Sequence, residues 1–98
     1  MAVTTTVAIA ATTSAQDSSD ITVDQGGVIQ VWMDDYMSGS EIIDVYRTDG
    51  ASIESKVVED GAPLSLSRKR QSFLLNGPGV FIIKKPATLR PIAVLYDS

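Results

Sequence analysis

Residues 72–83 read Ser-Phe-Leu-Leu-Asn-Gly-Pro-Gly-Val-Phe-Ile-Ile, two short apolar runs on either side of a turn. Asn-Gly-Pro-Gly concentrates turn-forming residues, because Gly tolerates positive φ and Pro fixes φ at about −65°. Each run is too short for a typical helix and is rich in residues that favour strands. The stretch therefore predicts two antiparallel strands joined as a hairpin.

The same pattern of short alternating runs and turns extends in both directions from this stretch. Asp49-Gly50 is the dipeptide most typical of a tight hairpin turn, and Pro86 and Pro91 bracket a loop before the last run. No segment keeps the apolar spacing of a helix for three turns. About seven strands, spaced roughly ten residues apart, predict an all-β antiparallel sandwich of immunoglobulin-like or jelly-roll-like type. The predicted strands are 29–33, 43–46, 53–57, 64–66, 72–75, 80–83 and 92–96.

Residues 1–20 differ in composition from the rest of the chain. Ala, Thr and Ser supply thirteen of the twenty, which is typical of a flexible extended arm. Between Val3 and Ala11, however, β-branched residues alternate as in a strand. Such a strand could pair with the sheet edge of a partner through Val3, Val7 and Ile9. The sequence thus predicts an N-terminal arm over 1–20 and a β-sandwich domain over 21–98.

Composition excludes several classes of function. The chain has 98 residues with no Cys and no His, which removes disulfides, thiolate nucleophiles, Cys/His zinc sites and the Ser-His-Asp triad. Asp34, Asp35 and Glu41 offer oxygen ligands for calcium but lack the EF-hand spacing. The prediction is a protein that is not an enzyme and has no metal or cofactor. A domain this small buries only about 64% of its surface and gains from oligomerisation.

The charges are divided between the two ends of the sequence. The net charge is −4, but residues 1–60 carry eleven acids and two bases, whereas residues 61–98 carry six bases and one acid. In one interpretation, acidic and basic strands lie side by side and neutralise each other. In the other, an acidic face of one subunit meets a basic face of the next and directs assembly.

Arg68-Lys69-Arg70 is the sharpest local charge feature. It is interpreted either as a solvated edge that opposes aggregation or as a patch that docks on an acidic protein surface. An overall acidic balance argues against nucleic acid as a partner. The apolar stretch Val7–Ala11 is far shorter than the ~20 residues that span a bilayer, so no membrane partner is predicted. The first sixteen residues have no Lys or Arg, which argues against a secretory signal and for synthesis in a cytoplasm.

The segment Leu74–Thr88 combines Gly-Pro-Gly, an aromatic strand, a Lys pair and Pro-Ala-Thr before a short final strand. This ending, with the Thr/Ala-rich amino terminus, resembles small virion proteins of tailed bacteriophages, in particular capsid decoration (cement) proteins. The resemblance implies a β-sandwich module that binds the outside of an assembled head and reinforces it. It also implies the major capsid protein or another virion protein as partner, a homo-oligomer with a trimer favoured, and synthesis in the host bacterial cytoplasm before incorporation into the virion.

The alternative is a tail or head-fibre module that contacts host-surface glycans or other virion proteins. Carbohydrates are often bound by aromatic rings that present a flat apolar face. Tyr36 and Tyr46 are the surface aromatics that could serve, whereas Trp32 is expected in the core.

Overall fold

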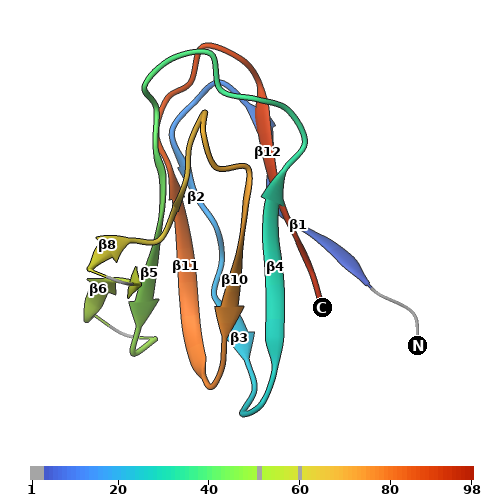
Figure 1. Cartoon of the computed structure of the whole chain (residues 1–98). Coiled ribbons are helices and arrows are strands. Elements are labelled where there is room, and N and C mark those ends of the chain that lie inside the picture. The colour runs from blue at the N-terminus through green and yellow to red at the C-terminus, as the bar shows by residue number, and fades with distance from the viewer. Residues whose placement is uncertain (1–3, 51, 60) are drawn as a thin grey trace.

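The computed structural model describes residues 4–50, 52–59 and 61–98, and every helix or strand element within them is a β-strand (Figure 1). All strand pairs are antiparallel, so the predicted all-β antiparallel class is confirmed. The strands are β1 (Thr5–Thr12), β2 (Gln16–Asp17), β3 (Ile21–Val23), β4 (Val28–Met33), β5 (Ile43–Thr48), β6 (Glu54–Lys56), β7 (Val58–Glu59), β8 (Ala62–Pro63), β9 (Ser65–Leu66), β10 (Ser72–Asn76), β11 (Gly79–Lys85) and β12 (Ile92–Asp97).

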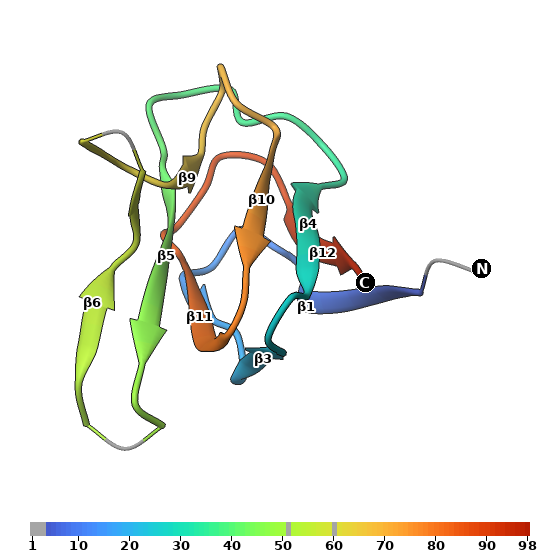
Figure 2. The same ribbon diagram turned by 60° about the horizontal axis from the view of Figure 1, so that its bottom comes forward.

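Most strands belong to two larger sheets. Sheet A has the order β1-β12-β4-β10, and sheet B has the order β2-β11-β5-β6, with β3 also on β11 and β9 also on β5. A small hairpin, β7-β8, lies beside them. Figure 2 shows β10, β4, β12 and β1 on one side of the molecule and β11, β5 and β6 on the other.

The core lies between the inner faces of the two sheets. Side chains alternate along each strand, so every second residue points inward. Val31 and Leu75 of sheet A and Ile43 and Ile83 of sheet B are each at most 2% exposed, and all four belong to one buried cluster. The apolar alternation that predicted the strands is therefore the pattern that fills this core.

The predicted hairpin over 72–83 is wrong in its pairing. Both strands form, but β10 pairs with β4 in sheet A and β11 pairs with β5, β2 and β3 in sheet B. The turn at Gly77-Pro78, whose peptide bond is cis, passes from one sheet to the other. Phe73 and Leu75 consequently contribute to the core from one sheet, and Phe81 from the other. Local alternation predicts the strands but carries no information on which sheet each one joins.

The Asp49-Gly50 turn does join a hairpin, as predicted. β5 and β6 are antiparallel neighbours, with Thr48 opposite Glu54. Gly50 has φ of 82°, a conformation that Gly adopts without the steric cost of a Cβ.

Residues 5–12, within the predicted arm, form a strand of the domain. β1 pairs with β12 of the same chain, from Thr5 opposite Asp97 to Thr12 opposite Ile92. Ile9 is 1% exposed and lies in the core cluster. Burial of Ile9 offsets part of the entropy cost of ordering the segment.

Candidate protein-binding surfaces

The outer face of sheet A is nearly free of charge. Its inward residues are buried, so their neighbours in each strand point outward. The strand register then aligns Val7, Leu95, Trp32 and Ser72 in one row across all four strands. We call the outward set the sheet A face; it consists of Thr5, Val7, Val28, Gln30, Trp32, Ser72, Leu74, Asn76, Leu95 and Asp97.

Three aliphatic side chains stand exposed on the sheet A face. Val7 is 57% exposed, Val28 51% and Leu74 54%. Asp97 is the ionisable residue of the set, and its Oδ1 accepts a hydrogen bond of 2.7 Å from the Thr5 hydroxyl. A broad exposed surface of this kind is typical of protein–protein contact sites.

The outer face of sheet B has the opposite character. Lys84 donates to Glu54 at 2.6 Å, and the Lys56 ammonium lies 3.6 Å from Asp44. The hydrogen bond that Lys84 donates to Glu54 raises the pKa of Lys84, whose ammonium also lies 4.8 Å from the ring centre of Tyr46. Charged, half-exposed side chains of both signs are typical of a solvated sheet face. Of the two sheets, sheet A therefore offers the better contact surface.

The predicted docking patch lies at one end of the molecule, in the turn between β9 and β10 (top of Figure 1). Reciprocal backbone hydrogen bonds between Ser67 and Arg70, of 2.8 and 3.1 Å, close this turn. Arg68, Lys69 and Arg70 are all exposed, and none forms an ion pair with another described residue. We call these three residues the basic turn.

Two loops beside the basic turn are fixed by carboxylates. Glu41 accepts backbone hydrogen bonds from Gly39 at 2.8 Å and Leu89 at 2.9 Å, and the bond from Leu89 holds the pKa of Glu41 below its ordinary value. Arg90 donates to Asp35 at 2.7 Å, which lowers the pKa of Asp35. Loops 34–42 and 86–91 are thus tied together as a rigid end.

This end also presents apolar surface. Ile42 is 50% exposed and Leu89 is 76% exposed. A shallow hollow of about 170 Å³ lies between Ile42 and the side chains of Arg68 and Lys69. The basic turn therefore has apolar neighbours, Ile42 and Leu89, on the two loops that Glu41 and Asp35 hold in place.

Two ion pairs connect the acidic and basic halves of the sequence. Lys84–Glu54 and Arg90–Asp35 each join a basic residue of 61–98 to an acidic residue of 1–60 within one chain. This agrees with the first interpretation, in which the two halves neutralise each other. Among the described residues of the basic half, this pairing leaves over the exposed basic turn and the buried Lys85.

The proposed calcium ligands are already engaged with protein donors. Asp34 accepts the Ala93 N–H at 2.9 Å, while Asp35 and Glu41 make the contacts given above. Across residues 4–50, 52–59 and 61–98, no group of three or more Asp, Glu, Cys or His is placed to hold a metal ion.

The three aromatic candidates lie on three separate surfaces. Trp32 lies on the sheet A face instead of in the core, Tyr46 on the outer face of sheet B, and Tyr36 in the 34–42 loop. The Arg90 guanidinium lies 4.5 Å from the ring centre of Tyr36, so cations already face both tyrosines. The structure does not bring these rings together as a stacking platform for a sugar.

The partner-contacting residues predicted in the arm have different positions. Val7 is exposed on the sheet A face, whereas Ile9 points into the core and is closed to a partner. Val3 lies outside the described residues.

Sequence reasoning missed a buried lysine. Lys85 is 2% exposed, and its ammonium donates to the backbone oxygens of Ser14 at 2.9 Å and Pro86 at 3.1 Å. Burial lowers its pKa. Its position two residues after Ile83, on the inward side of β11, was a signal that could have revealed it.

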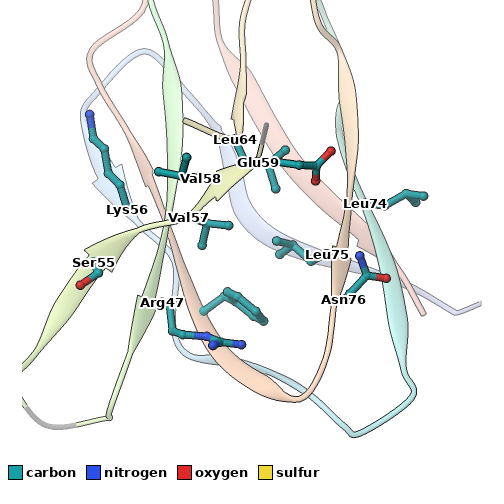
Figure 3. A pocket seen from close by; sticks show the side chains of 11 residues that line it. Arg47, Ser55, Lys56, Val57, Val58, Glu59, Leu64, Leu74, Leu75 and Asn76 are labelled. Carbon is teal, nitrogen blue, oxygen red and sulfur yellow. The ribbon is translucent and has the colours of Figure 1, made fainter. Parts of the chain in front are cut away.

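A cavity of about 380 Å³ opens between β10 and the segment 55–59 (Figure 3). Val57, Leu64, Leu75 and Phe81 form its apolar walls. Arg47 is at the rim, where it donates to the Pro78 carbonyl at 2.7 Å and lies over the Phe81 ring.

No protein-family model, curated protein or solved structure matches the chain. In the part of the chain that the structure describes, no helix has the length and apolar character needed to cross a membrane.

Proposed function

We propose that the chain is a capsid decoration module that binds the outer surface of an assembled phage head and stabilises it. The observation that carries this proposal is the contrast between the sheet A face, with its exposed Val7, Val28 and Leu74, and the charged outer face of sheet B. A module that lies on a shell needs one face to bind and one to meet solvent. The resemblance to small virion proteins supplies the class of partner.

We further propose that the fold is a β-sandwich of the jelly-roll type. With β2 and β3 taken as one strand and the short β7–β9 left aside, eight strands remain. The first pairs with the last, the second with the seventh, the third with the sixth and the fourth with the fifth. Such nested pairing, folded into two sheets, characterises a jelly roll. This order favours the jelly roll over the immunoglobulin-like alternative.

The proposed mechanism is mechanical and involves no chemical step. The aliphatic side chains of the sheet A face pack on the major capsid protein, and the basic turn docks on an acidic part of the same shell. Because the module binds the assembled shell and not its separated subunits, binding shifts the assembly equilibrium towards the intact head. The fixed loops at the basic end reduce the ordering cost of docking.

Cosedimentation with undecorated heads of the phage that encodes the chain tests this proposal. The double variant Val7→Asp/Val28→Asp should bind at least tenfold more weakly, because each carboxylate must be desolvated at the contact. Thr22 is also exposed and lies on the outer face of sheet B, so Thr22→Asp is the matched control and should bind like the wild type. Wild-type affinity of the double variant, with unchanged thermal unfolding, would contradict docking through the sheet A face.

Charge reversal of the basic turn tests the second contact. Arg68→Glu/Lys69→Glu/Arg70→Glu should weaken head binding and reduce its dependence on salt concentration, since ion pairs at a rim are screened by salt. If binding and its salt dependence stay unchanged, the basic turn is a solvated edge and not a docking element.

A further inference from the structure

The free edge of β10 presents a defined set of backbone groups. The Gly77 N–H donates to the Gly27 carbonyl at 2.9 Å, which makes these two residues a hydrogen-bonded pair in continuation of the β10–β4 register. Hydrogen-bonded and non-hydrogen-bonded pairs alternate along antiparallel strands. The N–H and C=O groups of Ser72, Leu74 and Asn76 therefore point away from β4. Among the described residues, no strand pairs with this edge.

The other sheet edges carry features that oppose strand addition. β6 contains Glu54 and Lys56, and β2 contains Asp17. β1 has two register shifts between Val7 and Thr12, which interrupt a regular ladder. Charges and bulges of this kind are the usual protection of sheet edges. β10 is uncharged, has no Pro and keeps an unbroken register with β4 over five residues.

We propose that two copies of this chain pair through their β10 strands, antiparallel and about a twofold axis at Leu74. Leu74 is the middle of the three residues whose backbone groups point away from β4, so the edge is self-complementary. Leu74 lies opposite Leu74 of the second copy, and Ser72 lies opposite its Asn76. Sheet A then continues through both copies. The two Leu74 side chains, each 54% exposed in the single chain, cover one another.

Charge complementarity favours a second copy as the occupant. The basic turn precedes β10, whereas the exposed Asp24 lies at the opposite end, where its carbonyl accepts the Gly27 N–H at 2.9 Å. Antiparallel pairing brings the basic turn of each copy next to Asp24 of the other. The paired strands carry no charge themselves, so no like charges oppose each other along the ladder.

This inference goes beyond the proposed function and does not depend on it. A twofold axis perpendicular to the sheet turns both sheet A faces in the same direction. Val7 and Val28 of both copies can then face one partner, whereas Leu74 is covered in the pair. The trimer that the phage resemblance implies would instead require β10 to pair with a different edge.

Sedimentation equilibrium of the full chain, compared with a Leu74→Pro variant, tests the pairing. The wild type should be a dimer of twice the 10.5 kDa chain mass. Leu74→Pro removes an N–H that points outward, so the bonds of Phe73 and Leu75 to β4 remain and the variant should be a folded monomer. Leu74→Thr keeps the N–H and loses the Leu74–Leu74 contact alone, so it should dimerise more weakly than the wild type but more strongly than Leu74→Pro.

Two further measurements keep the test decisive if Leu74→Pro fails to fold. In wild-type protein, hydrogen exchange at the Leu74 and Asn76 amides should slow as protein concentration rises. Asp24→Lys should weaken the dimer at least fivefold, and adding Arg70→Asp should restore it. A monomeric or trimeric wild type, a Leu74→Pro dimer as strong as the wild type, or exchange independent of concentration would overturn the proposal. Head binding is measured separately, so loss of the dimer leaves the decoration proposal standing.

Discussion

Replacing Ile9 by Ala tests whether β1 is an integral part of the core. Ile9 is 1% exposed and belongs to the buried cluster, so the substitution removes buried methyl and methylene groups and leaves a cavity. Such changes cost about 2–5 kcal/mol. Because β1 is an edge strand that can partly close the cavity, we expect about 3 kcal/mol. That is a large share of the ~5–15 kcal/mol that stabilises a domain of this size.

Urea unfolding followed by tryptophan fluorescence measures the effect. With a slope of about 1.3 kcal/mol per M, the midpoint should fall by about 2 M. Val7→Ala is the matched control in the same strand, because Val7 is 57% exposed, and it should cost less than about 1 kcal/mol. If Ile9→Ala unfolds at the same urea concentration as Val7→Ala, β1 contributes nothing to the core and the 1–20 segment acts as a detached arm.

Three other changes have defined outcomes, each measured by urea unfolding. Gly77→Ala should destabilise by about 1–3 kcal/mol, because its Cβ would overlap a backbone carbonyl of the loop before β4; an unchanged midpoint would contradict that close approach. Ser18→Ala removes the hydroxyl that accepts the buried Ile83 N–H at 2.9 Å, and should cost about 1–3 kcal/mol unless that N–H is bonded elsewhere. The pKa values of Asp35 and Glu41 are lowered by folding, so their contribution is present above the unfolded-state pKa and lost as pH falls through the folded value. Stability should therefore fall from about pH 4 downwards, and Asp35→Asn/Glu41→Gln should flatten that fall.

Sequence patterning predicts the strands well because the alternation of inward and outward residues is a local property. Val31 of β4 and Val45 of β5 are buried as their alternation requires, and the Asp49-Gly50 turn joins the strands it was expected to join. Pairing depends on contacts between residues far apart in the chain. That is why the sequence correctly places Phe73 and Phe81 in strands yet wrongly pairs those strands as a hairpin.

The candidate surfaces show the same limit. The basic turn is visible in the sequence, because three successive charges between short strands seldom become buried. The sheet A face is not, since Val7, Trp32 and Leu74 come from three strands and become neighbours only through the register. The sequence places Ile9 in an arm because a segment of Ala and Thr has few large apolar side chains to bury. Ile9 becomes buried only when β1 pairs with β12, which is far away in the sequence.

The pairing of β1 with β12 also constrains how the chain folds. β1 is synthesised before its hydrogen-bonding partner, residues 92–97, which lies far along the chain. Thr4 and Ser98 exchange backbone hydrogen bonds of 3.2 and 3.0 Å, which close the ladder at the far end. Pairing between such distant segments carries a high loop-closure cost and is typical of slow folding. During synthesis the β1 segment therefore stays without its partner until residues 92–97 have been made, so that an early segment of this sheet is among the last to reach its place.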